Sequence, residues 1–423
     1  MARHLFPIIA LLASCAFLLA GGGLHGILLP IRGQLEGFTT FQIGWIGTGW
    51  AVGFTLGCIL VPRLVRRVGH IRAFSTMAAL LSTVMLLNGL IVSAPGWVVL
   101  RAIAGLCFSG SYMVMESWLN ERMTNENRGA IFSIYMVVSL GATMAGQYLI
   151  VAADPELDTL FMVGAILYAL AVLPTAISTA QSPAPLTQVD LDLWALFRNS
   201  PVAAVGSIIS GVISSTWGNF APVYGQQSGM SSVGIANLMV AAMVGAVVFQ
   251  YPLGRLSDII DRRYAMVIAG IVGAVSGIML STYTGSGIGS STFLFWIVLY
   301  GGVIYSIYSL NVAHANDVGD TDDFVKIASG LLILYGIGTM IGPLMAAQMM
   351  SEFGVGALFL TTTIAHLTYA AYAFYRSLRR AQVEQDEQVN FQVGPMVRAQ
   401  TPETYQLDPR SDAEAYAEQQ EDG

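Results

Sequence analysis

The stretch "MVMESWLNERMTNENRGAIFSIYM", residues 113–136, joins two apolar runs through a short charged loop. The first run ends just after Glu116 and Trp118, and the second starts at Arg128 and Gly129. A carboxylate therefore lies in the last turn of an apolar run, with an arginine across the loop. What these two charges can do depends on the surroundings of the two runs.

Composition indicates that lipid is the solvent for much of this chain. Of its 423 residues, 55% are apolar and only 11% are charged, and the mean hydropathy is +0.64. Soluble domains carry about 25% charged residues. Runs of about 20 apolar residues, long enough for a membrane helix, are predicted at residues 5–30, 42–62, 74–93, 98–119, 130–152, 160–180, 202–222, 233–253, 264–284, 292–314, 327–350 and 355–375. We expect an all-α polytopic membrane protein with twelve transmembrane helices.

Arginines mark one side of the predicted membrane protein. The loops after spans 2, 4 and 8 carry Arg63, Arg66, Arg67, Arg72, Arg122, Arg128, Arg255, Arg262 and Arg263. The loops on the other side carry little beyond Arg32. Because loops rich in Lys and Arg stay on the cytoplasmic side, we expect both termini there. The chain contains no N-x-[ST] sequon, which favours a bacterial inner (plasma) membrane.

The two halves of the chain resemble each other at an offset of 196 residues. Without gaps, Arg66 and Arg67 align with Arg262 and Arg263, and both copies share a TM-x-G ending, at residues 143–146 and 339–342. Six spans per copy keep the copies in the same orientation. Such parallel repeats are related by an axis along the membrane normal and share a cavity between them.

This repeat divides the chain into four predicted segments. We expect six-helix bundles at residues 1–180 and 201–380, joined by a cytoplasmic linker at residues 181–200. Residues 381–423 contain ten acidic residues and two arginines. Such a polar, acidic composition is typical of disorder, so we expect a disordered cytoplasmic tail.

With these features the chain resembles a transporter of the major facilitator superfamily over nearly all of residues 5–375. The string "GRLSDIIDRR", residues 254–263, is similar to the family's loop motif, with Asp258 as the acid and Arg262 and Arg263 as the basic pair. Asp261 replaces the usual glycine, and the first-half copy has no Asp. The string "ESWLN…RG" resembles a poorly characterised bacterial branch. The resemblance implies alternating access with a cytoplasmic gate of charged residues.

Three roles are open for Glu116. It can extend to headgroup water, it can carry a proton, or it can pair with Arg66, Arg67 or Arg128 while the cytoplasmic side is shut. The gate is favoured, because an acid within a membrane segment usually pairs with a nearby cation. Asp258, Arg262 and Arg263 are expected to form the gate of the second half.

Five further residues are candidates for the substrate cavity or for coupling. Arg101 either anchors the outer end of span 4 or faces the cavity. His25 can carry a proton, although a polar contact between helices is favoured. Asn219 is a candidate for substrate recognition, whereas Trp217 and Tyr224 fit either a cavity or an aromatic belt at the membrane interface.

These features predict a monomeric secondary transporter of a small molecule in a lipid bilayer. The GK[ST] sequence of a phosphate-binding loop is missing, and no nucleophile, metal or nucleic-acid motif appears. We therefore expect no enzyme activity, no cofactor, no metal and no nucleic-acid partner. Proton coupling is common in the family, but uniport stays open. The alternative is a membrane receptor or sensor of the same fold that signals through a partner and transports nothing.

Overall fold

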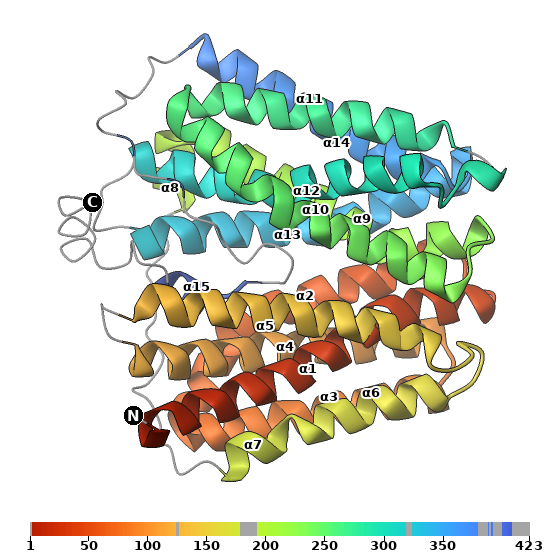
Figure 1. The fold of residues 1–423 in the computed structure, drawn as a ribbon, viewed down its shortest axis with the longest axis vertical. Coiled ribbons are helices and arrows are strands. Elements are labelled where there is room, and N and C mark those ends of the chain that lie inside the picture. Colours follow the sequence, from red (N-terminus) through yellow and green to blue (C-terminus); the bar gives the residue numbers. More distant parts are fainter. Residues whose placement is uncertain are drawn as a thin grey trace.

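The computed structural model describes residues 2–123, 127–177, 193–283, 285–318, 324–379, 388, 391 and 400–407. Apart from connecting turns, these residues form helices (Figure 1). The α-helices are α1 (Ala2–Leu35), α2 (Thr40–Val68), α3 (His70–Leu90), α4 (Ala94–Arg122), α5 (Arg128–Tyr148), α6 (Thr159–Leu170), α7 (Val172–Ile177), α8 (Leu193–Asn199), α9 (Pro201–Gln227), α10 (Ser232–Ile259), α11 (Arg262–Ser281), α12 (Ser291–Val318), α13 (Phe324–Phe353), α14 (Ala357–Ser377) and α15 (Pro402–Gln406). Two 3-10 turns are η1 (Leu149–Val151) and η2 (Gly285–Gly287).

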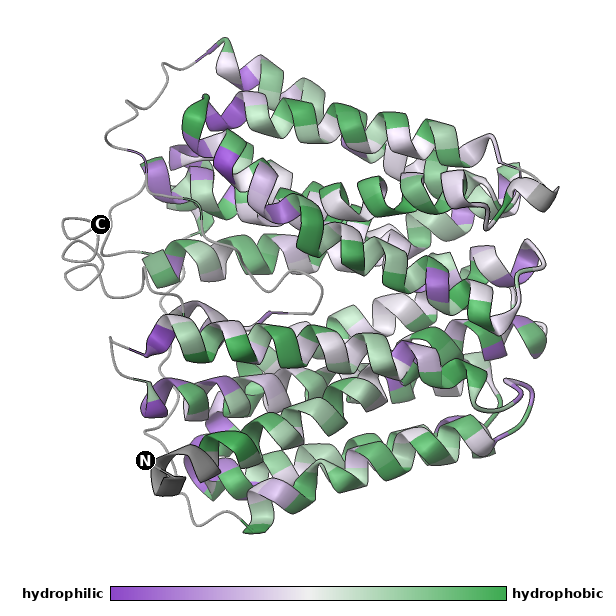
Figure 2. Cartoon of the chain, viewed as in Figure 1, coloured by the Kyte–Doolittle hydropathy of each residue, from purple (hydrophilic) through white to green (hydrophobic). Residues whose placement is uncertain are grey.

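In the part of the chain that the structure describes, twelve helical segments are long and apolar enough to cross a membrane, as predicted. They pass back and forth, so that α1 begins and α14 ends at one end of the bundle, called the terminal face below; the other end is the opposite face (Figure 1). Several helices run beyond their apolar cores, and α2 continues to Val68 through three arginines. Hydrophobic residues accordingly dominate the middle of the bundle, and hydrophilic residues gather at its ends (Figure 2).

Short sequence signals set the helix ends at the turns. Thr39 begins α2 with a capping box, in which its hydroxyl accepts from the Gln42 amide and the Gln42 side chain accepts from the Thr39 amide. Such a box satisfies amides that have no partner within the helix. At the other end of α2, Gly69 has a φ of 83°. Because side chains other than hydrogen rarely tolerate this conformation, the glycine lets α2 and α3 meet in a tight corner.

The two halves repeat the same packing. In the first half α2 packs against α4, α1 against α5 and α3 against α6. In the second half the corresponding pairs are α10 with α12, α9 with α13 and α11 with α14. The two bundles lie one above the other in Figure 1. The expected fold class, two six-helix parallel repeats, is therefore confirmed.

Equivalent glycines let helices approach closely in both halves. A Cβ on Gly146 of α5 would overlap the backbone of α1 at Ala20, and a Cβ on Gly342 of α13 would overlap the backbone of α9 at Val212. These two glycines end the TM-x-G sequences that align in the repeat. Without a hydrophobic driving force in lipid, helices associate through such close contacts between small residues.

The C-terminal region differs from the expectation for its described residues. Residues 400–407 include a short helix, α15, which packs against α4 of the first half and α13 of the second half. The prediction of a disordered tail is therefore wrong for this segment, because its threonines and Tyr405 find buried partners between the halves. Residues 381–387, 389–390, 392–399 and 408–423 lie outside the described residues, as does most of the expected linker, of which α8 is described.

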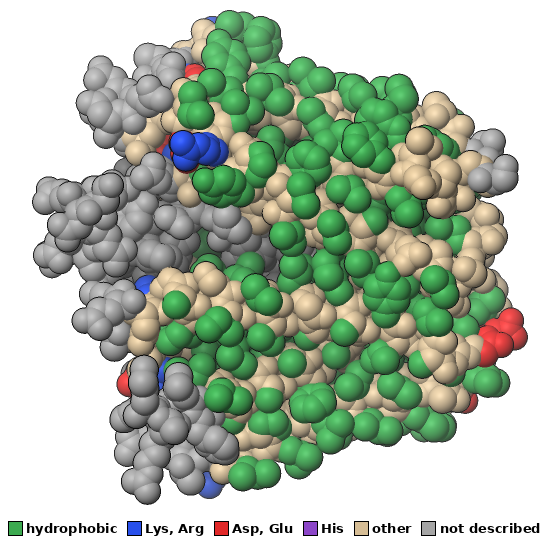
Figure 3. Space-filling model, in the orientation of Figure 1, with side chains coloured by type: hydrophobic (Ala, Val, Ile, Leu, Met, Phe, Trp, Pro, Cys, Tyr) green, Lys and Arg blue, Asp and Glu red, His purple; other side chains and the backbone are tan. Residues whose placement is uncertain are grey.

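The outer surface is apolar around its middle. Figure 3 shows hydrophobic side chains spread over the visible face between the two ends of the bundle. Exposed examples on α5, α10 and α11 include Val137, Val247 and Ile271. Since large apolar surfaces are rare on soluble monomers, this band is the surface that lipid covers.

A pair of alanine substitutions in α5 tests the close helix contacts. Gly146→Ala should lower thermal stability by about 1–3 kcal/mol, because the added methyl group collides with the backbone of α1. Gly141→Ala is the control, since Gly141 is exposed and nothing lies within 4 Å of its added Cβ. That variant should be neutral or slightly stabilising, because alanine favours the helix over glycine. Thermal unfolding of the purified variants in detergent provides the measurement, and equal melting temperatures would contradict the packing.

Candidate functional site

The two halves meet directly at the opposite face. There the Gln227 amide of α9 donates to Gln34 of α1 at 2.8 Å. Deeper in the bundle, the Thr48 hydroxyl of α2 donates to the Met340 carbonyl of α13 at 2.8 Å. The Tyr148 hydroxyl of α5 also donates to a side chain of α10, Asn237, at 2.6 Å. These hydrogen bonds join the helices of the two bundles and close the molecule at this end.

A cavity lies further towards the terminal face. It is small and is lined by Ser214, Ile304, Tyr305, Tyr308, Leu332, Tyr335 and Gln400. The hydroxyl groups of Ser214 and Tyr335 are 2.6 Å apart and form a hydrogen bond. Aromatic faces and hydroxyl groups together are what a pocket for a small, partly polar solute offers. Gln400 of the C-terminal segment closes one wall of this cavity.

Glu116 lies inside the bundle, six residues before the end of α4. Its side chain is fully buried and lies about 9 Å from the helix end, given a rise of 1.5 Å per residue. The carboxylate accepts hydrogen bonds from the hydroxyls of Tyr135 at 3.1 Å, Thr401 at 2.5 Å and Thr404 at 2.8 Å. Tyr135 belongs to α5 of the same half, whereas the threonines belong to the C-terminal segment. A buried carboxylate needs such partners, because its desolvation is costly.

The gate arginines of the first half lie apart from this carboxylate. Arg66 and Arg67 are exposed in the last turn of α2, and within the described part of the chain neither forms an ion pair with Glu116. Arg128 begins α5 and is half-buried. Glu116 was expected to pair with these arginines only while the cytoplasmic side is shut. That ion pair stays a prediction for another conformation.

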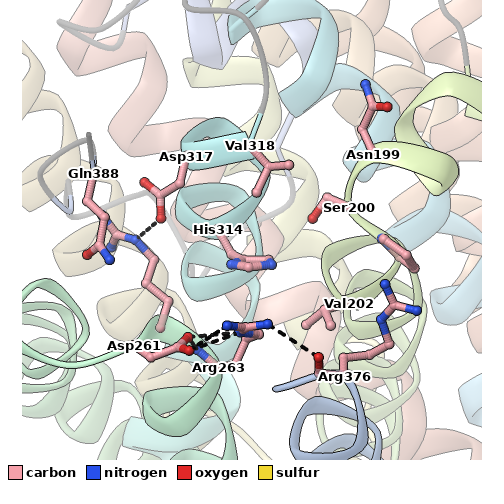
Figure 4. Close-up of a pocket in the computed structure, with 12 residues that line it drawn as sticks. Asn199, Ser200, Val202, Asp261, Arg263, His314, Asp317, Val318, Arg376 and Gln388 are labelled. Carbon is pink, nitrogen blue, oxygen red and sulfur yellow. Dashed lines mark hydrogen bonds and ion pairs between the residues drawn. The ribbon is translucent and has the colours of Figure 1, made fainter. Parts of the chain in front are cut away.

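In the second half, the basic pair is buried and paired with acids. Arg262 lies 3.0 Å from Asp258 and 2.5 Å from Asp317, and it also donates to the Ser257 hydroxyl at 3.1 Å. The Arg262 side chain is 1% exposed and that of Asp317 is 2% exposed. This ion pair therefore joins the start of α11 to the end of α12. Figure 4 shows the bond to Asp317 beside Gln388.

Asp261, which stands where the family motif has glycine, caps α11. Its carboxylate accepts from the backbone amide of Arg263 at 2.9 Å and binds the Arg263 guanidinium at 2.6 Å, as Figure 4 shows. Burial raises the pKa of this carboxyl, but the hydrogen bonds and charge of Arg263 lower it below its ordinary value. Because of this cap, Arg262 and Arg263 begin α11, whereas Arg66 and Arg67 end α2. The expected equivalence of the two pairs is therefore approximate.

Asp317 was not among the residues singled out from the sequence. The repeat contains a signal for it, because an offset of 196 residues places Asp317 opposite Glu121, just as Arg262 lies opposite Arg66. Glu121 is exposed in the first half. Both copies therefore carry an acid at the same distance along the sequence from the aligned arginine. This shared spacing could have indicated the ion pair between Arg262 and Asp317.

His25 lies in a polar contact between helices near the opposite face. Its Nε2 is 3.0 Å from the Asn88 side-chain nitrogen of α3, and its Nδ1 is 3.4 Å from the Tyr168 hydroxyl of α6. All three side chains are fully buried. This geometry is that of the favoured interpretation, an interhelical contact. Arg101 lies over the Trp50 ring, with 6.0 Å between the guanidinium carbon and the ring centre.

Trp217 and Tyr224 are buried in the second bundle and line neither the cavity nor the membrane surface. The Trp217 ring packs edge-on against Tyr300 at 5.4 Å, and the Tyr224 ring packs against Phe359 at 4.9 Å. Because both rings are buried in this aromatic core, neither belongs to a belt at the membrane interface, and a role in the substrate cavity stays a prediction. Asn219 is half-buried and faces Gly47 of α2, where the halves meet.

Comparison with known proteins places the chain in a family. A model of the Major Facilitator Superfamily matches residues 10–319 and 204–401, so the chain belongs to this superfamily. The uncharacterized MFS-type transporter YcaD of Escherichia fergusonii is 26% identical over 363 residues, which cover 85% of this chain and 93% of that protein. An uncharacterized MFS-type transporter of Enterobacter sp. strain 638 is 24% identical over 364 residues, with the same coverage. The chain is therefore a membrane transporter of this superfamily, and not an enzyme.

Solved structures share the fold at low sequence identity. A D323A mutant of the nucleoside transporter NupG superposes with a TM-score of 0.74 at 12% identity, over 88% of this chain and all of that chain. A bacterial homolog of the human lysosomal transporter Spinster, solved in an inward-facing and unoccupied conformation, has a TM-score of 0.74 at 13% identity and covers 92% of this chain and 98% of its own.

Replacing single acids tests the charge network of the second half. Asp317→Asn should lower stability by about 3 kcal/mol, because it removes one of the acids that pair with the buried Arg262. Asp258→Asn should cost less, since that side chain is 27% exposed. Arg66→Gln is the control and should change stability by less than about 0.5 kcal/mol, because its side chain is exposed. Thermal unfolding in detergent would contradict the network if Asp317→Asn behaved like Arg66→Gln.

The docking of residues 400–407 between the two halves should weaken as the pH rises. Burial, reinforced by the neighbouring Glu116 of α4, raises the pKa of Glu403 from 4.5 to about 8, and Cys58 of α2 is a further titratable neighbour. Because the docked pKa exceeds the free value, docking is strongest below pH 4.5 and weakens up to about pH 8, by at most about ten-fold per pH unit.

The measurement is the alkylation of a cysteine in the cavity wall, introduced by Ser214→Cys in a chain without its three native cysteines. The reference is an exposed cysteine just after α14, introduced by Arg379→Cys. The ratio of the two rates should rise between about pH 5 and pH 8. Glu403→Gln, which stays neutral, should flatten this profile. A ratio that does not change with pH in the unmodified segment would contradict the raised pKa.

Proposed function

We propose that this transporter carries a small hydroxylated solute across the bacterial inner membrane by alternating access. The observation that carries the proposal is the uneven contact between the halves. The bundles are hydrogen-bonded to each other at the opposite face, while the cavity and Glu116 lie towards the terminal face. This arrangement corresponds to one of the two states that such a cycle needs.

The distribution of charge supports a cytoplasmic terminal face. The arginines at the ends of α2 and α4 and the starts of α5 and α11 all lie at this end, and Figure 3 shows blue side chains there on the visible face. Positively charged segments next to membrane helices stay on the cytoplasmic side. In this orientation the cavity faces inward, as in the Spinster homolog of similar fold.

The chemistry of the cavity supports a solute with hydroxyl groups. The phenols of Tyr308 and Tyr335 line the cavity on the side of the second half. Glu116 lies outside this lining, and its carboxylate accepts hydrogen bonds from the hydroxyls of Thr401 and Thr404, the residues that follow the cavity-lining Gln400. A carboxylate binds hydroxyl donors through charge-assisted hydrogen bonds. Aromatic rings add apolar contact for a ring or carbon skeleton. Sealed vesicles with and without a pH gradient distinguish proton-coupled transport of such solutes from uniport.

Cross-linking the opposite face tests the alternating cycle. In a chain without native cysteines, Tyr148→Cys and Asn237→Cys replace a hydrogen-bonded pair across the halves. A short bismaleimide that joins them should abolish uptake of sugars and nucleosides into sealed vesicles, because that face then cannot open. The single-cysteine variants, treated in the same way, are the controls and should keep their activity.

The same variants distinguish a transporter from a non-transporting receptor. Uptake that is measurable and survives cross-linking would overturn alternating access. If no solute of the panel is taken up but the cross-link changes the binding of one, the receptor interpretation replaces the proposal.

A further inference from the structure

The two halves and the C-terminal segment together form an interaction surface that the transport cycle itself does not require. We infer that the space between α4, α12 and α13, next to the cavity that Gln400 helps to line, is a binding site for the chain's own residues 400–407, which lock the transporter in its present state and exclude solute. This inference goes beyond the proposed function, because it concerns a segment of the chain bound beside the cavity and the control of access.

The contact with the first half is specific in its chemistry. The hydroxyls of Thr401 and Thr404 both donate to one carboxylate oxygen of Glu116, at 2.5 and 2.8 Å. Thr401 and Glu116 are fully buried, and Thr404 is nearly so. Hydrogen bonds to an ionised acceptor are about twice as strong as bonds between neutral groups. The segment therefore occupies the hydrogen-bonding positions that a hydroxylated solute would take.

The contact with the second half involves an aromatic residue. The Tyr405 hydroxyl lies 2.5 Å from the Tyr308 hydroxyl of α12 and also donates to Gln400 at 2.6 Å. Its ring packs edge-on against Phe324 of α13, with 6.3 Å between the ring centres. Tyr405 is 5% exposed. The segment thus holds one side chain from each half at the same time.

A second anchor lies upstream, on the loop motif of the second half. The backbone amide of Phe391 donates to Asp258 at 3.0 Å, the acid that also pairs with Arg262. The Phe391 ring fills the space beside Gly254, where any side chain would overlap it. Asp258 and Gly254 both belong to the "GRLSDIIDRR" sequence, so the motif binds the C-terminal region as well as its own arginine.

Bridging both halves has an energetic consequence. A ligand shifts a conformational equilibrium only through different affinities for the two states. Residues 400–407 contact Glu116 and Tyr308 together only while the terminal face is open enough to admit them. Closing that face would have to expel the segment and break both sets of bonds. Docking therefore stabilises the present state and slows the cycle.

The test uses the full-length chain and needs no knowledge of the transported solute. A cysteine in the cavity wall, introduced by Ser214→Cys in the cysteine-free chain, is alkylated with a membrane-impermeant maleimide. In the variant that combines Thr401→Ala, Thr404→Ala and Tyr405→Phe, this labelling should accelerate at least about ten-fold, because the charge-assisted bonds that hold the segment are lost. The exposed cysteine of Arg379→Cys, just after α14, is the reference and should label equally fast in both backgrounds.

A peptide supplies the missing segment in trans. The synthetic sequence "QTPETYQL", residues 400–407, should restore protection of the cavity cysteine in the combined variant. The same peptide with alanine at the positions of Thr401 and Thr404 should not. Faster labelling together with protection by the first peptide alone supports the inference.

Unchanged labelling in the combined variant, or equal protection by both peptides, would overturn the inference. These outcomes do not depend on uptake, so they separate it from the proposed function. If the peptide protects the cavity cysteine but the protein transports nothing, the binding site for residues 400–407 is supported and the transport proposal is wrong. If transport is normal but the peptide gives no protection, the transport proposal is supported and the binding site is wrong.

Discussion

Lipid offers no hydrogen bonds, so a charged or titratable side chain within the bundle is costly to bury unless the protein supplies its partners. Arg262 meets this constraint with Asp258 and Asp317, and His25 meets it with Asn88 and Tyr168. Glu116 meets it with hydroxyl groups, two of which come from the far end of the chain. The first two groups are satisfied within one half. Glu116, in contrast, needs hydrogen bonds from the C-terminal segment, so its partners are present only when that segment is docked.

The repeat has kept its packing while its charges have diverged. Both halves bring equivalent helices together at equivalent glycines. Arg66, however, is exposed at the end of α2, whereas its counterpart Arg262 is buried at the start of α11. The carboxylate of Asp261 caps α11, so that this helix begins at Arg262 and its first turn carries the basic pair into the protein. The second half therefore has a fixed charge network where the first half has exposed arginines.

Patterns local to the sequence predicted the twelve spans and the two repeats, because length, apolarity and a fixed offset decide both. Contacts between distant segments could not be predicted in the same way. The sequence could not show that the Trp217 ring packs against Tyr300 and the Tyr224 ring against Phe359, within the second bundle. The composition of residues 381–423 suggested disorder, yet only a few side chains decide whether a short segment docks. Thr401 and Glu116 are 285 residues apart, and no local pattern connects them.

The contact between Glu116 and Thr401 can form only late in the synthesis of the chain. The ribosome releases residues 400–407 only after all twelve membrane helices have been made. During insertion the carboxylate in α4 must remain hydrated, because two of its hydroxyl partners do not yet exist. The C-terminal segment therefore binds between helices that have already been made. Until that step, the Glu116 carboxylate is accessible from the terminal face, while hydrogen bonds between the halves close the opposite face.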